Sequence, residues 1–198
     1  MTSKLTLTLR AACLALAVLP LVAAAAAPDP DDRLTRSRAL ADQLTGQLKQ
    51  ELQQALQAGG PVAAIDVCRN RAPAIAAQLS QESGARIGRT ALRIRNPANA
   101  PDEPERKVLQ QFSEELAAAK PPPPEPPEAV FELRTPQGVE LRYMRAIPLQ
   151  PPCVLCHGKT IAPDVAAAIQ RHYPEDTATG FEPGELRGAV TVRWPAGQ

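Results

Sequence analysis

Two cysteines and a histidine in the C-terminal quarter carry the most informative chemistry of this sequence. They form the stretch Cys153-Val154-Leu155-Cys156-His157, which has the pattern C-x-x-C-H and is followed by a glycine. In this pattern two thiols add to the two vinyl groups of one porphyrin, and the histidine binds the iron as its proximal ligand. The spacing therefore predicts one covalently attached haem c, with Cys153 and Cys156 as thioethers and His157 on the iron.

Two other kinds of site share the C-x-x-C core. A thioredoxin-like redox pair would open a helix within a βαβ pattern, and no such pattern surrounds residues 153–156. A structural zinc site needs four ligands, but the sequence has neither a second C-x-x-C nor an H-x-x-x-H pair. Haem attachment is favoured over both.

The second axial ligand of the iron has three candidates in the sequence. Cys68 lies on the apolar side of a predicted helix, and only Cys13 near the N-terminus remains to pair with it. His172 ends a short predicted helix, where capping or surface histidines are common. Met144 lies in a predicted strand and is expected to pack in the core. A thiol at Cys68 would bind Fe(III) as a thiolate and lower the reduction potential.

The first 27 residues have the features of a secretory signal peptide. Lys4 and Arg10 precede an apolar stretch, and alanines at 23–27 offer a cleavage site. We expect a periplasmic domain over residues 28–198, without a membrane anchor, since c-type haem is generally attached outside the cytoplasm. An uncleaved anchor is the alternative, although the apolar run is short and alanine-rich.

The charge of the expected mature chain excludes one class of partner. The signal peptide takes two of the 22 basic residues and none of the 21 acidic ones, which leaves 20 − 21 = −1. The sequence has no basic run and no basic face rich in aromatic residues. Nucleic-acid binding is therefore not expected.

Residues 31–84 are predicted to form a helical part. A long helix is expected over 31–58, because its leucines recur every four residues, and a Gly-Gly pair ends it. A second helix is expected over 61–83. Pro73 has no N–H to donate within this helix and should kink it about one turn after Cys68.

The rest of the sequence favours an antiparallel α+β fold with flanking helices. Six prolines at 121–127 predict a stiff surface connector, with a ligand for a proline-reading partner as the alternative. The other predicted elements are a strand at 86–95, a helix over 103–120 with an Asp102/Glu105 capping box, a hairpin at 130–134 and 139–147, a helix over 163–173, and a last strand at 186–194.

Four blocks besides the haem motif resemble a known family. In chain order they are Cys68-Arg69-Asn70-Arg71-Ala72-Pro73, Arg95-Asn96-Pro97-Ala98-Asn99-Ala100-Pro101-Asp102, Tyr173-Pro174-Glu175-Asp176-Thr177-Ala178-Thr179-Gly180 and Gly184-Glu185-Leu186-Arg187-Gly188. From about Asp31 to Trp194 the chain resembles single-haem c-type domains with a PAS-like fold, which occur alone or as extracytoplasmic sensor segments. The resemblance implies a PAS-like antiparallel sheet and iron ligation by His157 and Cys68.

Together these observations predict a periplasmic haem protein that cycles between Fe(II) and Fe(III) in electron transfer or redox sensing, and that is not an enzyme. Its partner would be a redox protein or a separate signalling protein. One alternative is a gas or redox sensor in which Cys68 leaves the iron; another is a haem peroxidase with His172 as its distal group. The candidates for binding the haem propionates are Arg93, Arg95, Arg142, Arg145 and Lys159.

Overall fold

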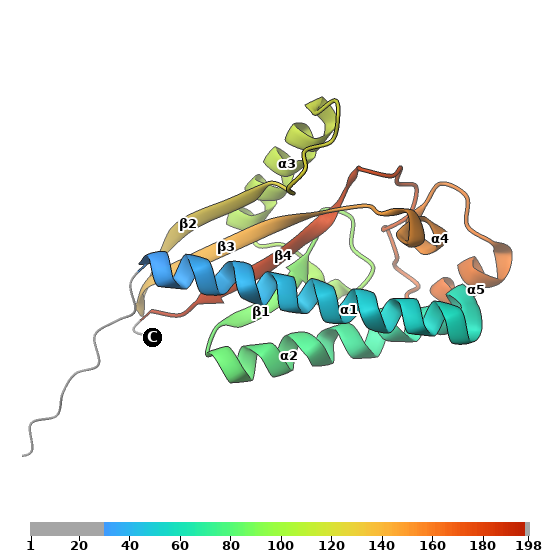
Figure 1. Cartoon of the computed structure of the whole chain (residues 1–198), viewed down its shortest axis with the longest axis horizontal. Coiled ribbons are helices and arrows are strands. Elements are labelled where there is room, and N and C mark those ends of the chain that lie inside the picture. Colours follow the sequence, from blue (N-terminus) through green and yellow to red (C-terminus); the bar gives the residue numbers. More distant parts are fainter. Residues whose placement is uncertain (1–29, 197–198) are drawn as a thin grey trace, which may run out of the picture.

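A computed structural model describes residues 30–196, and a four-stranded antiparallel sheet forms its centre (Figure 1). The strands are β1 (Arg86–Thr90), β2 (Glu128–Thr135), β3 (Gly138–Pro148) and β4 (Leu186–Trp194), in the order β1-β4-β3-β2. The predicted α+β class and antiparallel sheet are confirmed, while the PAS-like description remains a prediction. The predicted signal peptide lies outside the described residues.

Helix α1 (Pro30–Asp66) lies across one face of this sheet and continues beyond the ends of the strands (Figure 1). Leu40 and Leu44 are buried there in one cluster with Val190 and Trp194 of β4. The predicted helix end is a kink, because Gly60 adopts a φ of 71°, a left-handed conformation that glycine tolerates best. Over residues 30–196 no helix is both long and apolar enough to cross a membrane.

The kink predicted near Pro73 is a π-helical turn. This turn, η1 (Val67–Arg71), joins α1 to α2 (Ala72–Ser83), and the Ala72 N–H donates to the Val67 carbonyl five residues earlier. Proline removes the donor that the Arg69 carbonyl would receive in a regular α-helix, so the ladder is interrupted at this point. Cys68 lies inside the wider turn, and single π-turns are frequent at functional sites.

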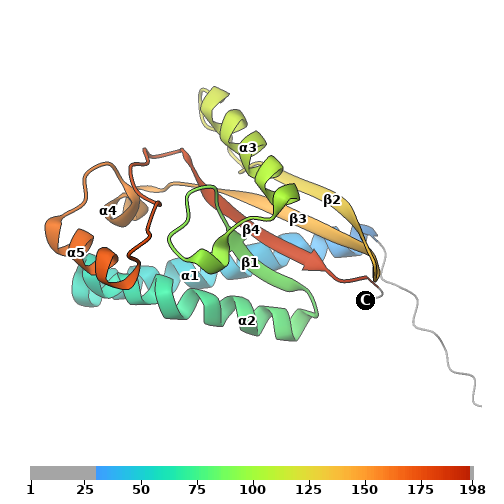
Figure 2. The same cartoon turned by 180° about the vertical axis from the view of Figure 1, so that it is seen from behind.

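Helix α3 (Glu103–Ala118) covers the opposite face of the sheet (Figure 2). It begins with the predicted capping box, in which Asp102 and Glu105 exchange side-chain to backbone hydrogen bonds. Leu109 and Phe112 pack on Met144, which is fully buried. Met144 therefore has the packing role that its position in a strand suggested. The proline-rich run at 121–127 connects α3 to β2.

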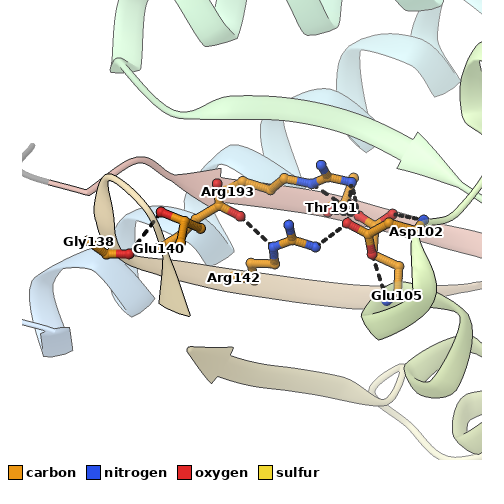
Figure 3. Close-up of polar contacts among 8 residues, drawn as sticks. Asp102, Glu105, Gly138, Glu140, Arg142, Thr191 and Arg193 are labelled. Atoms are coloured by element: carbon orange, nitrogen blue, oxygen red, sulfur yellow. Dashed lines mark hydrogen bonds and ion pairs between the residues drawn. The ribbon is translucent and has the colours of Figure 1, made fainter. Parts of the chain in front are cut away.

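A network of charged side chains runs along β3 and β4 to the start of α3 (Figure 3). Glu105 is fully buried and accepts hydrogen bonds from the Thr191 hydroxyl at 2.8 Å and the Arg193 guanidinium at 2.7 Å. Arg142 donates to Asp102 and Glu140 on either side of it. The network fixes the start of α3 on β3 and β4.

We expect Glu105→Ala to lower the free energy of unfolding by about 3 kcal/mol, because it removes the buried acceptor of the Thr191 hydroxyl and leaves Arg193 with only its longer ion pair to Asp102. Urea unfolding followed by circular dichroism measures the loss. Glu103→Ala is the matched control, since Glu103 lies in the same helical turn with its side chain 68% exposed. Equal losses in the two variants would show that the buried network contributes nothing.

The chain leaves the sheet earlier than predicted, at Thr90 instead of residue 95. The alternation over 92–95 suggested a strand, but the Ile94 N–H donates to the Thr177 hydroxyl at 2.9 Å, outside the sheet. This part of the strand prediction is wrong. The short helices α4 (Val154–His157) and α5 (Pro163–His172) follow β3 and lie together at the end of α1, as both views show (Figures 1 and 2).

Candidate functional site

The C-x-x-C-H motif forms a tight helical turn at the end of the sheet. A 3₁₀ turn, η3 (Pro151–Cys153), runs into α4, so that Cys153, Cys156 and His157 occur at the spacing of one helix face. Cys156 packs on a cluster that includes Ile65 of α1, and Cys153 packs on one that includes Ala178. The motif thus joins the helical part of the chain to its C-terminal part.

Both motif cysteines are free thiols, and burial raises the pKa of each. A thioredoxin-like pair requires the opposite, a thiolate stabilised by a lowered pKa. The surroundings of Cys153 and Cys156 therefore argue against the redox-pair alternative. These surroundings suit two neighbouring thiols whose role is not thiol–disulfide exchange.

His157 is held as a metal ligand should be. Its Nδ1 lies 2.7 Å from the Ala178 carbonyl oxygen, which can only accept, and 3.2 Å from Arg187 Nε, which can only donate. The shorter contact favours the tautomer with the hydrogen on Nδ1. The Nε2 lone pair is then free for a metal, with the carbonyl orienting the ring. Burial, followed by the positive charges of Arg187 and Arg95, lowers the pKa of His157 to about 2. The imidazole is therefore neutral, the form that binds iron.

The backbone around His157 is fixed by residues 178–181. Phe181 donates to the His157 carbonyl at 3.0 Å, and Gly180 donates to the Gly158 carbonyl at 2.9 Å. Gly158 allows the chain to turn here, since a Cβ at this position would lie 2.6 Å from the Val154 carbonyl oxygen. These contacts with residues 178–181, a segment distant in sequence, set the position of His157.

Cys68 lies within electrostatic reach of the motif. Burial is the largest cause of the raised pKa values of Cys153, Cys156 and Tyr173, and the electrostatic influence of Cys68 raises each of them further. The structure thus brings the predicted distal ligand and the predicted haem attachment together across the fold. Ligation of iron by Cys68 itself stays a prediction.

Neighbouring side chains hold the turn of Cys68 in place. Arg71 donates two hydrogen bonds of 2.7 Å to Glu51 of α1. On the other side of the turn, Arg69 Nη1 lies 3.1 Å from Nδ1 of His172 at the end of α5. His172, the alternative distal ligand, is exposed and in contact with this guanidinium. Cys68 is half-buried and better placed for the role.

Arg95, one of the predicted propionate ligands, lies inside the site. Its Nη2 donates to the Cys156 carbonyl at 2.7 Å and to the Asp176 carboxylate at 2.9 Å, and both side chains are less than a tenth exposed. Its Nε is buried without any hydrogen-bond partner in the described structure. A buried donor without a partner costs free energy, so this position calls for an acceptor that the polypeptide does not supply.

The other predicted propionate ligands have partners elsewhere. Arg142 belongs to the network under α3, and Arg145 pairs with Asp42 at 2.7 Å. Lys159 pairs with Glu182 on the surface. Arg93 is exposed and stacks on the Phe181 ring, 3.5 Å from its centroid. Of the five predicted propionate ligands in the described structure, Arg95 alone donates a hydrogen bond to the motif and still has an unpaired N–H, at Nε.

Two arginines of the site were not among the residues predicted from the sequence. Arg187 is the extra residue of a β-bulge, because Ile147 pairs with Gly188 and Pro148 with Leu186. Its Nε lies 3.2 Å from His157 Nδ1. Arg89 of β1 adds a second positive charge within reach of both His157 and Arg187. The motif Gly184–Gly188 marked the region, but only strand pairing and the bulge reveal where Arg187 goes.

The donor set of this site fits a haem. One neutral imidazole, two adjacent free thiols and a third thiol nearby match the iron and the two vinyl groups, and buried arginines match carboxylates. Over residues 30–196 no group of three or more His, Cys, Asp or Glu side chains is arranged to hold a metal ion. Iron here would depend on porphyrin nitrogens for most of its ligands.

The fold and the site together define the class, an α+β domain with a C-x-x-C-H turn at the end of its sheet and a second cysteine in a π-helical turn of its helical part. The chain belongs to the Tll0287-like family, whose model, described as Tll0287, matches residues 31–195. This confirms the family resemblance drawn from the sequence.

A solved structure is also similar to this chain. It is the crystal structure of the cyanobacterial heme-protein Tll0287, with 27% sequence identity and a TM-score of 0.58. The similarity covers 85% of this chain and 98% of that one, so it includes the whole domain of the relative. No curated protein matches the chain.

Proposed function

We propose that the protein binds one haem c through thioether bonds to Cys153 and Cys156 and acts in the periplasm as an Fe(II)/Fe(III) centre, in electron transfer or redox sensing. The observation that carries this proposal is His157, whose Nδ1–H bonds to the Ala178 carbonyl and whose ring is neutral. A 27% identical relative described as a heme-protein supports it. Bound haem would supply a reversible one-electron couple.

The chain's own residues set the properties of this centre. His157 and Cys68 are the residues that would hold the iron, and a thiolate at Cys68 would stabilise Fe(III) over Fe(II) and give a low potential. The cluster of Ile65, Val165 and Ile169 that packs on Cys156 keeps water from this part of the site. A separate redox or signalling protein would exchange electrons or the signal with the domain.

A first measurement tests the proposal directly. The mature chain is produced in the periplasm of a host with cytochrome c maturation, and its absorption and electron spin resonance spectra are recorded. We expect about one haem per chain, resistant to acid–acetone extraction, with a six-coordinate low-spin ferric signal of thiolate type. A chain that is folded but free of haem contradicts the proposed function, and a high-spin signal contradicts ligation by Cys68.

The π-helical turn favours a second candidate function, sensing by ligand exchange. Cys68 lies in a turn whose hydrogen bonds already depart from the α-helical pattern, so its release from iron needs no break in a regular helix. We expect a sensor to bind carbon monoxide or nitric oxide after reduction, with loss of the thiolate signature. Failure of the reduced protein to bind either gas would contradict sensing by ligand exchange and leave electron transfer or redox sensing as the function.

We propose no enzymatic activity. A peroxidase needs an acid–base group over an open iron position. His172, the candidate for that group, is exposed and in contact with Arg69. Peroxide turnover should be no faster than that of free haem, and a faster rate would reinstate the peroxidase alternative.

A further inference from the structure

Positive charge gathers beside His157 in excess of the carboxylates available to balance it. The guanidinium groups of Arg89, Arg95 and Arg187 all lie within electrostatic reach of the His157 ring. Asp176 is the one carboxylate bonded to any of the three, and it bonds to Arg95. In the described structure Arg187 donates to the Arg93 carbonyl and contacts His157, and no hydrogen bond or ion pair joins Arg89 to a carboxylate. Two cations of the cluster therefore lack a counter-anion.

Such an arrangement is costly unless an anion completes it. Arg187 lies between the Arg93 carbonyl oxygen and the His157 ring, 3.2 Å from each, and the side chains of Arg187 and Arg89 are both partly buried. Charges withdrawn from solvent are normally paired, because an uncompensated one is destabilising. The unpartnered Nε of Arg95 adds a donor to the same place.

Two different features of the backbone, a β-bulge and the strand register, direct Arg187 and Arg89 towards the motif. Arg187 is the unpaired residue of the bulge between β3 and β4, and bulges re-aim side chains next to active sites. Arg89 pairs with Val190, so both side chains point to the sheet face on which α1 and α2 pack. Both side chains place a charge in a half-buried position, which packing alone does not require.

We infer that Arg187 and Arg89 bind the two propionate carboxylates of the haem, with Arg95 contributing a further donor; the inference rests on the proposed haem binding. Haem attached at Cys153 and Cys156 and ligated by His157 brings two carboxylates into this part of the molecule, which equals the number of cations without a partner. Arginine suits the task, since its planar fork binds carboxylates in a bidentate manner. A mobile anion such as chloride or phosphate in the same place is the competing occupant.

Resonance Raman spectroscopy of the covalently loaded protein tests the inference, because the propionate bending bands report hydrogen bonding to the carboxylates. Arg187→Gln and Arg89→Gln should each shift these bands towards weaker hydrogen bonding, and Arg187→Lys and Arg89→Lys should restore part of the shift. Each lost charge should also move the oxidation–reduction equilibrium towards Fe(III) by about tenfold, or about 59 mV for a one-electron couple. Arg86→Gln is the control, an exposed arginine on the same strand as Arg89.

The possible outcomes separate the two proposals. A parent chain without haem overturns the proposed function itself. Loaded variants with unchanged propionate bands overturn the arginine assignment while haem binding stands, and bands that respond to added chloride or phosphate show a mobile anion at the site instead. If Arg89→Gln moves the thiolate signature and not the propionate bands, Arg89 serves Cys68. Should the glutamine variants not fold, the lysine variants decide, because they keep the charge but lose the fork, and unchanged bands in them count against the inference.

Discussion

Cys153→Ala/Cys156→Ala is expected to abolish covalent haem attachment, which is the largest effect predicted for any substitution in this chain. Thioether bonds are the one link that survives denaturation, so the double variant should lose all haem-linked peroxidase staining on a denaturing gel. Each single variant should keep one thioether bond. Its pyridine haemochrome band should then move to the longer wavelength typical of a porphyrin with one free vinyl group.

Leu155→Ala provides the matched control for this experiment. Leu155 lies between the two cysteines but is 43% exposed, so its loss changes the motif turn without removing a reactive group. We expect full haem content in this variant. Equal haem loss in Leu155→Ala and in the double cysteine variant would mean that the turn, and not the thiols, holds the cofactor.

Cys68→Ala is expected to remove the thiolate signature from the ferric spectrum and to raise the midpoint potential on the order of 0.1 V or more, within the range of about 0.8 V that axial ligands command. The reason is electrostatic, because an anionic sulfur stabilises Fe(III) and its loss removes that preference. Spectroelectrochemical titration measures the potential. The open iron position should also bind imidazole or cyanide more readily than in the parent protein.

Two further variants make this result specific to the ligand. Cys68→Met retains a sulfur that can bind iron but carries no charge, so a low-spin haem without the thiolate signature is expected. Val67→Ala removes a buried neighbour in the same π-helical turn and should leave spectrum and potential as they are. If Cys68→Ala has the spectrum and potential of the parent, the cysteine is a packing residue and the ligand lies elsewhere.

Most of the secondary structure was predictable because its signals are local. The Asp102/Glu105 capping box, the hairpin around residues 136–137 and the final strand to Trp194 follow from short patterns, and all occur as predicted. The strand at 86–95 was overextended, since alternation over 92–95 cannot reveal that the Ile94 backbone bonds to Thr177 across the fold. Pro73 marked the interruption of the helix correctly, but its π-helical form depends on the three-dimensional path of the chain.

The site was predictable in its reactive groups and not in its surroundings. The spacing of Cys153, Cys156 and His157 is itself the signal, and the structure adds only their orientation. Arg89 has no sequence signal, and the block Gly184–Gly188 marks the region of Arg187 without indicating its role, because the place of both arginines depends on strand register and on one extra residue in β4. Arg142 was predicted as a propionate ligand, but it pairs with Asp102 and Glu140 on the other face of the sheet.

The π-helical turn of Cys68 lies between α1 and α2. Its Ala72 N–H bonds to the Val67 carbonyl, and Pro73 has no N–H for the Arg69 carbonyl, so a regular α-helical ladder does not run through this point. Arg71 bonds to Glu51 of α1 and Arg69 contacts His172 of α5, so side-chain contacts hold the turn from two sides. Because the turn joins α1 to α2, any change in its hydrogen bonding would alter the angle between these two helices.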